Sequence, residues 1–171
     1  MTFGDWMQGL CAIVFALLLC ATSATAQDQP RLNLMPMPAN LQTGTGDLRI
    51  DSSFSVALTG HTGARLDRAV QRFLRQLSRQ TAIPLSSKPS TKPTLTIHTD
   101  HASKEAQELG EDESYTLSIS TDGAKIDAPT PLGAMHALQT FLQLVEVSPN
   151  GFTAPAVTIQ DKPRFPWRGR H

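Results

Sequence analysis

Two segments of the sequence have the 3.6-residue spacing of a helix with a single apolar face. In residues 62–83, TGARLDRAVQRFLRQLSRQTAI, this face consists of Leu66, Ala69, Val70, Phe73, Leu74 and Leu77. Residues 130–147 start with Thr130 as a helix cap and Pro131 at the first helical position. Their apolar face consists of Leu132, Met135, Leu138, Phe141, Leu142 and Val145. A helix of this kind must bury its apolar face against another element, and this requirement limits the possible folds.

Short segments of alternating apolar residues predict the strands that provide this cover. They are residues 54–58, 94–99, 115–126 and 156–161. Residues 115–126 predict a β-hairpin with its turn at Asp122 and Gly123. Residues 43–47, TGTGD, predict a further turn, with residues 48–50 returning from it. The predicted fold class is α+β, with one mostly antiparallel or mixed sheet and both amphipathic helices packed on one face.

The first 26 residues have the pattern of a secretory signal peptide. Their apolar run, residues 10–21, is short for a membrane span, and residues 24–26 offer a small-x-small cleavage site. The region before this run departs from the pattern, because it has no lysine or arginine and contains Asp5. An uncleaved N-terminal anchor is the alternative. We expect an exported protein, periplasmic or secreted, that loses both cysteines and any membrane contact on cleavage.

The charge balance bears on possible partners. The chain has 15 basic and 15 acidic residues and no formal net charge, which argues against nucleic acid as a partner. Residues 62–83 nevertheless contain an arginine stripe, formed by Arg65, Arg68, Arg72, Arg75 and Arg79. The stripe is either a surface for anions or nucleic acid, or a solvated helix face. We favour the solvated face, because the chain is neutral and no aromatic residues are interleaved.

Common catalytic signatures are absent from the sequence, which has no HExxH, GxSxG or P-loop motif. The run His98-Thr99-Asp100-His101 could suggest a metal site. However, two histidines at this spacing on a strand end point in different directions, and no third ligand is evident. The acidic run 111–113 is interpreted as a solvated loop. We therefore expect no metal and no cofactor.

Three phrases occur together in order: DESYTLSI at residues 112–119, PLGAMHALQTFLQL at 131–144 and DKPRFPWRGRH at 161–171. They resemble the N-terminal domain of the family 20 glycoside hydrolases, the β-N-acetylhexosaminidases. The phrase LNLMPMPANLQ at 32–42 also fits the start of that domain. The resemblance implies that residues 27–160 form the family's α+β domain. It implies that residues 161–171 begin a (β/α)8 catalytic barrel that is otherwise missing.

In this family the reaction is a substrate-assisted, retaining hydrolysis of terminal non-reducing N-acetylhexosamine from glycans. The catalytic Asp-Glu pair belongs further along the barrel, so the resemblance predicts that this chain is inactive alone. The arginine of the R-G pair corresponds to Arg168, which the resemblance implies to be a substrate-binding residue. The alternative is a free-standing interaction or carbohydrate-binding module. The main aromatic residues that such a module could use for sugar stacking are Tyr115 and Phe152, and they predict only a poor stacking surface.

Overall fold

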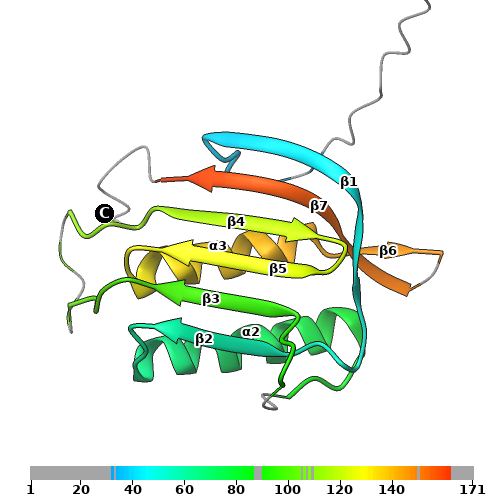
Figure 1. Ribbon diagram of the computed structural model, residues 1–171, viewed down its shortest axis with the longest axis horizontal. Coiled ribbons are helices and arrows are strands. Elements are labelled where there is room, and N and C mark those ends of the chain that lie inside the picture. The colour runs from blue at the N-terminus through cyan, green and yellow to red at the C-terminus, as the bar shows by residue number, and fades with distance from the viewer. Residues whose placement is uncertain are drawn as a thin grey trace, which may run out of the picture. The chain divides into compact units, whose positions relative to one another are not determined.

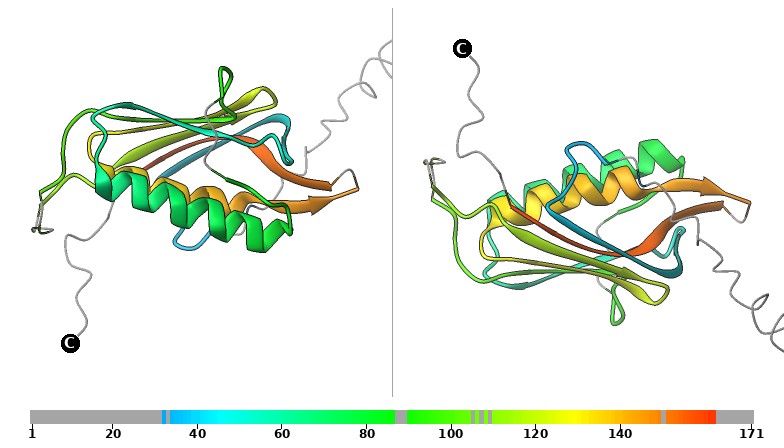
Figure 2. Two further views of the ribbon diagram at one scale, coloured as in Figure 1. Left: turned by 90° about the horizontal axis from the view of Figure 1, so that it is seen from below. Right: turned by 90° about the horizontal axis from the view of Figure 1, so that it is seen from above.

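The computed structural model describes residue 32 and residues 34–86, 90–104, 106, 108, 110–149 and 151–162. This part of the chain is a seven-stranded mixed sheet with two helices on one face (Figures 1 and 2). The predicted fold class is thereby confirmed. Among the described residues, no helix combines the length and apolar character needed to cross a membrane.

The strand order is β1-β7-β4-β5-β3-β2, and β6 pairs with β7. The strands are β1 (Asn40–Ile50), β2 (Val56–Gly60), β3 (Leu95–Thr99), β4 (Tyr115–Ser120), β5 (Gly123–Ala128), β6 (Glu146–Ser148) and β7 (Gly151–Asp161). The pairs β2–β3 and β3–β5 are parallel, and the remaining pairs are antiparallel. The last strand therefore lies between the first strand and β4, and it joins the two ends of the described chain.

The helices α2 (Ala64–Thr81) and α3 (Pro131–Leu144) match the two predicted amphipathic segments. All six residues of the predicted apolar face of α2 are buried. The Thr130 hydroxyl accepts a hydrogen bond from the Leu132 amide at 3.2 Å, and Pro131 lies in the first turn of α3, as predicted. Burial of α3 extends beyond its predicted face to Gly133, Ala134 and Ala137, because this helix lies over the middle of the sheet.

The core lies between the helices and the sheet. Phe54, Phe73 and Phe141 meet there with ring centroids 5.6–6.2 Å apart, and each is at most 3% exposed. Alternate residues of β3, β4 and β5 point toward this cluster, and their neighbours face the opposite side of the sheet. Burial of each large apolar side chain contributes roughly 1.5–3 kcal/mol to stability.

The predicted turn at residues 43–47 is wrong. Residues 40–50 form one strand that pairs with β7 on both sides of an irregularity between Thr43 and Asp47. Gly46 has a φ of +86°, and Gly44 lies against Ala156 of β7. These glycines provide the backbone freedom of a bulge rather than that of a turn, and the chain continues in its original direction.

The final strand is longer than predicted. It starts at Gly151 rather than residue 156, and residues 146–148 form a short strand that pairs back onto it. Pro155, which has no amide hydrogen, pairs with Asp47 at the edge of the irregular part of β1 and lies beyond the residues that pair with β4. A proline is tolerated here because its missing amide hydrogen does not interrupt the pairing with β4.

Candidate functional site

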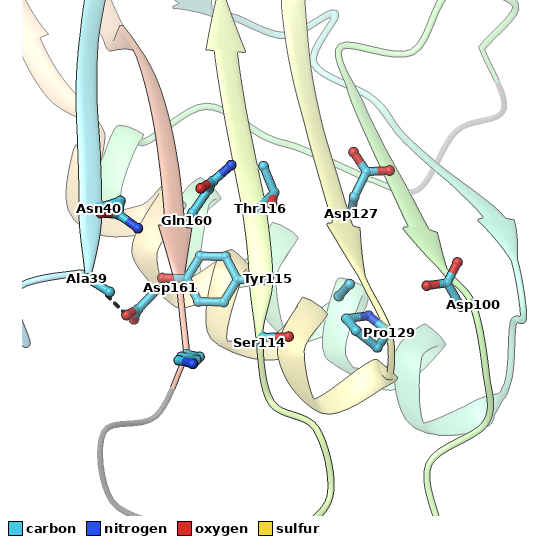
Figure 3. Close-up of a pocket in the computed structure, with 12 residues that line it drawn as sticks. Ala39, Asn40, Asp100, Ser114, Tyr115, Thr116, Asp127, Pro129, Gln160 and Asp161 are labelled. Atoms are coloured by element: carbon cyan, nitrogen blue, oxygen red, sulfur yellow. Dashed lines mark hydrogen bonds between the residues drawn. The ribbon is translucent and has the colours of Figure 1, made fainter.

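A groove of about 440 Å³ lies at the end of the sheet where β7 finishes (Figure 3). We call it the sheet-end groove. Strands β1 and β4 begin here, and β3, β5 and β7 end here, so the topology gathers five chain segments at one place. The groove is lined by Ala39, Asn40, Asp100, Ser114, Tyr115, Thr116, Asp127, Ala128, Pro129, Gln160, Asp161 and Lys162.

Polar side chains form a row across neighbouring strands on the wall of this groove. Strand registers pair Asn40 with Gln160, Gln160 with Thr116, and Thr116 with Asp127. These residues alternate with the buried apolar positions, and therefore they face away from the helices. The row offers amide, hydroxyl and carboxylate groups, which suit hydrogen bonding to a polar partner.

The three carboxylates of the sheet-end groove each have a nearby cation or donor. The Asp100 carboxylate lies 3.3 Å from His98 Nε2, and that of Asp127 lies 2.8 Å from Lys125 Nζ. The Asp161 carboxylate accepts the Ala39 amide at 3.0 Å, which fastens the end of β7 to the residue before β1. Only the Asp161 contact joins two segments of the sheet end, because the Asp100 and Asp127 contacts are each to a residue two positions earlier in the same segment.

The acidic run 111–113 is a loop, as predicted, but only part of it is solvated. Glu113 Oε2 lies 2.9 Å from His136 Nε2 of α3, and the Glu113 side chain is only 20% exposed. The Asp112 carbonyl accepts a hydrogen bond from the Thr130 hydroxyl at 2.6 Å. The prediction therefore holds for Asp112, which is exposed, but not for Glu113, whose carboxylate is held against α3 by a contact distant in sequence.

Asp112 lies two residues before Ser114 of the groove, and its carboxyl has a lowered pKa. Hydrogen bonds from the side chain and the backbone amide of Ser114 hold the pKa of Asp112 below its usual value. The Asp112 carboxylate and the Ser114 amide are 2.9 Å apart. This local turn shapes the backbone just before β4 and serves structure rather than proton transfer.

The two histidines of the run 98–101 contact different partners. His98 Nδ1 lies 3.1 Å from the Thr59 hydroxyl, in addition to the Asp100 contact. The His101 backbone amide donates to the Pro129 carbonyl at 2.9 Å. Within the described ranges, no three or more His, Cys, Asp or Glu side chains are grouped so that they could hold a metal ion.

The two aromatic candidates for sugar stacking are not open platforms. Tyr115 is 6% exposed, and its hydroxyl lies 2.6 Å from that of Thr140 on α3. Phe152 is half-buried and packs against the core. Arg168, predicted to bind substrate, lies outside the described residues, as do the predicted signal peptide and residues 163–171.

Sequence reasoning missed the contact between Glu113 and His136 and the row from Asn40 to Asp127. Glu113 and His136 are 23 residues apart, and no local pattern pairs them. The row depends on which strands are neighbours, and this is a property of the whole sheet. The only available signal was a histidine on a helix that is otherwise mostly apolar.

Comparison with known proteins identifies the class to which this fold belongs. Residues 34–144, more than half of the chain, match the family described as "beta-acetyl hexosaminidase like". The chain therefore belongs to the β-hexosaminidase family, the family 20 glycoside hydrolases, and the matching part corresponds to their N-terminal domain. This confirms the resemblance found in the sequence.

Individual relatives agree with this assignment. The chain is 32% identical to "Beta-hexosaminidase subunit A1" of Dictyostelium discoideum, covering 92% of this chain and 29% of the relative. It is 30% identical to "Beta-hexosaminidase 1" of Arabidopsis thaliana, covering 92% of this chain and 34% of the relative. The chain thus spans about a third or less of these relatives.

Solved structures show the same fold. The Flavobacterium johnsoniae chitobiase superposes with a TM-score of 0.75 and 35% identity, covering 81% of this chain and 22% of that protein. The exo-β-N-acetylglucosaminidase of Vibrio harveyi, solved with N-acetylglucosamine, gives a TM-score of 0.61 and 26% identity. That comparison covers 80% of this chain and 20% of the Vibrio protein.

Proposed function

We propose that this chain provides the non-catalytic N-terminal domain of an exported β-N-acetylhexosaminidase. The enzyme would remove terminal non-reducing N-acetylhexosamine from glycans, using the acetamido group of the substrate in place of a protein nucleophile. The observation that carries the proposal is the family match over residues 34–144, which lies entirely within the described domain. The similar proteins, β-hexosaminidases and a chitobiase, support the same substrate class.

The domain's part in this function would be to support the catalytic barrel that follows it. The end of β7 is held from both sides, since Asp161 pairs with Tyr115 and accepts the Ala39 amide. The position from which a segment after Lys162 would leave the domain is therefore set by the end of β7. In this proposal the polar row of the sheet-end groove is available to contact the barrel.

Arg168 would contact substrate in the assembled enzyme. A guanidinium presents a rigid fork of donors, which can hold two adjacent sugar hydroxyls. The catalytic carboxylates would come from the barrel, and among the described residues the groove supplies no such pair. We expect the 171-residue chain to be inactive alone.

The test measures release of a chromogenic aglycone from an N-acetylglucosaminide by the purified 171-residue chain. We expect no turnover above buffer, and clear turnover would contradict the proposal. Reading the coding DNA immediately downstream gives the complementary result, since we expect it to encode barrel strands and an adjacent Asp-Glu pair. If the downstream DNA encodes neither, the alternative of a free-standing module is favoured.

That alternative has its own measurement, a titration of the chain with neutral N-acetylglucosamine oligomers. We expect no saturable binding, because Tyr115 is buried and Phe152 packs against the core. Stacking on an exposed aromatic face is the usual way for a protein to hold a neutral sugar ring, and neither residue offers such a face.

A further inference from the structure

The outer face of α2 carries positive charge along most of its length. Its arginines are spaced three, four, three and four residues apart, so they fall within an arc of roughly 80° and a length of about 21 Å. This arginine stripe consists of Arg65, Arg68, Arg72, Arg75 and Arg79. The buried residues of α2 lie on the opposite side of the helix, and the stripe therefore points directly away from the core.

Most of this charge is not neutralised within the domain. Four of the arginines, Arg68, Arg72, Arg75 and Arg79, are exposed, and none forms a hydrogen bond or ion pair within the described part of the chain. Arg65 is half-buried and donates to the Ser103 hydroxyl at 3.0 Å. The acidic residue of α2, Asp67, lies about 100° around the helix from the neighbouring Arg68.

Three of the five described cations outside α2 form ion pairs. Arg49, Lys104 and Lys125 each lie beside a carboxylate, from Asp51, Glu108 and Asp127 respectively. Among the described residues, Lys92 and Lys162 are the other cations without an ion pair, so α2 holds four of the six described cations that lack one. Like charges three and four residues apart weaken a helix, so this arrangement does not serve helix stability.

We propose that the arginine stripe binds a polyanionic polysaccharide, a glycan that carries carboxylate or sulfate groups along its length. A linear chain can lie along the stripe, and each guanidinium can form paired hydrogen bonds to one anionic group. The choice of a glycan rests on the proposed function, because an exported glycan hydrolase meets such polymers. Binding would hold the enzyme close to anionic glycans without using its catalytic pocket.

The composition of the α2 surface disfavours two other polyanions. Its only aromatic residue, Phe73, is buried, so α2 has no exposed ring on which nucleic acid bases could stack. The exposed neighbours of the stripe include Gln71 and Gln76 rather than apolar residues that enter a lipid surface. Nucleic acid and anionic membranes therefore become competing ligands in the test.

The test measures binding of heparin, as a sulfated polysaccharide, to the 171-residue chain at several NaCl concentrations. We expect saturable binding that weakens steeply with salt. The triple variant R72Q/R75Q/R79Q should bind at least tenfold more weakly at low salt. The slope of log K against log salt should fall in magnitude by roughly 2–3, by analogy with the charge dependence of nucleic acid binding.

A second triple variant provides the matched control. R49Q/K104Q/K125Q removes the same number of positive charges from outside the stripe and should bind heparin within about twofold of the wild type. Equal loss in both variants would show a net-charge effect and overturn the proposal. Circular dichroism checks that each variant is folded. The α2 variant should be folded because glutamine and arginine have similar helix propensities.

Three further outcomes would refute the stripe as a glycan site. They are no saturable heparin binding, tighter binding of single-stranded DNA than of heparin, and tighter binding of phosphatidylglycerol vesicles than of heparin. The proposed function is judged separately, by the downstream DNA and by turnover of a neutral chromogenic substrate. A failed heparin experiment with a downstream Asp-Glu pair would therefore overturn this inference alone.

Discussion

At the scale of single residues, Gly133 fixes how closely α3 approaches the sheet. A Cβ at this position would overlap the backbone carbonyl of Ser114 and would lie 3.2 Å from the Ala128 Cβ. We expect Gly133→Ala to destabilise the domain by about 1–3 kcal/mol, although alanine favours a helix, because backbone atoms must move apart. Urea denaturation followed by far-UV circular dichroism measures the change.

Gly63 provides the comparison for this prediction. It precedes α2 with an extended backbone, φ −171°, and a Cβ there would have no neighbour within 4 Å. We expect Gly63→Ala to cost less than about 1 kcal/mol, since alanine is only a poorer helix cap. If both substitutions lower the free energy of unfolding by the same amount, the close approach of α3 to the sheet at Gly133 does not explain the loss of stability.

Asp112 makes stability depend on acid pH. Its pKa is lowered in the folded protein by hydrogen bonds from Ser114, so its contribution is present above about pH 4, its unfolded value, and is lost as pH falls through the folded pKa. We expect Ser114→Ala to reduce the free energy of unfolding at pH 6 by less than about 1 kcal/mol, because water screens this exposed carboxylate. The difference from wild type should shrink toward pH 2.

Ser118 is a suitable control, because it lies on β4, which Ser114 immediately precedes, and points to the open face of the sheet. Ser118→Ala should change stability equally at both pH values. A Ser114→Ala effect that stays constant from pH 6 to pH 2 would contradict the role assigned to Asp112.

At the scale of elements, the arginine stripe predicts a stabilising substitution on α2. Arg72 lies four residues after Arg68 and three before Arg75, so Arg72→Gln removes two repulsive neighbours. At about 0.2–0.5 kcal/mol for each like-charge pair, we expect a gain of roughly 0.4–1 kcal/mol at low salt. The gain should diminish at 1 M NaCl, where charges are screened. Thermal unfolding at both salt concentrations measures it, and a loss of stability would contradict it.

The helices were predictable from the sequence because their signal is local. Periodicity placed them at 62–83 and 130–147, and the structure has them at Ala64–Thr81 and Pro131–Leu144. The strands were harder, since their extent depends on partners far along the chain. Gly44 and Gly46 supply the same backbone freedom to a bulge as to a turn, and only pairing with β7 distinguishes the two.

The candidate site was predictable only in part. Phrases along the chain identified the family, but the sheet-end groove arises where β1, β3, β4, β5 and β7 meet. Asn40 and Gln160 are neighbours because the first and last strands pair, and no local pattern encodes this pairing. Arg168 was predicted by resemblance, lies outside the described residues and remains a prediction.

At the scale of the whole molecule, β7 completes the sheet, because it lies between β1 and β4, two strands that precede it in the sequence. It pairs with β1, β4 and β6, and it buries Ala154, Val157 and Ile159 in the core. Without β7, β1 has no partner in the sheet, and β4 exposes one edge. The packed domain therefore requires the chain up to Asp161, whereas none of the described contacts requires residues after Lys162.

Truncation tests this requirement. We expect a chain ending at Lys162 to unfold cooperatively in urea, with a free energy within about 1 kcal/mol of the 171-residue chain. A chain ending at Phe152 should show no cooperative transition. It loses the buried side chains of Val157 and Ile159, at roughly 1.5–3 kcal/mol each, together with the pairing that β7 gives to β1 and β4, and this loss is comparable with the whole stability of a domain. A cooperative transition in the shorter chain would show that the helices and remaining strands fold without β7. Loss of the transition on ending at Lys162 would show that residues 163–171 contribute to the domain itself.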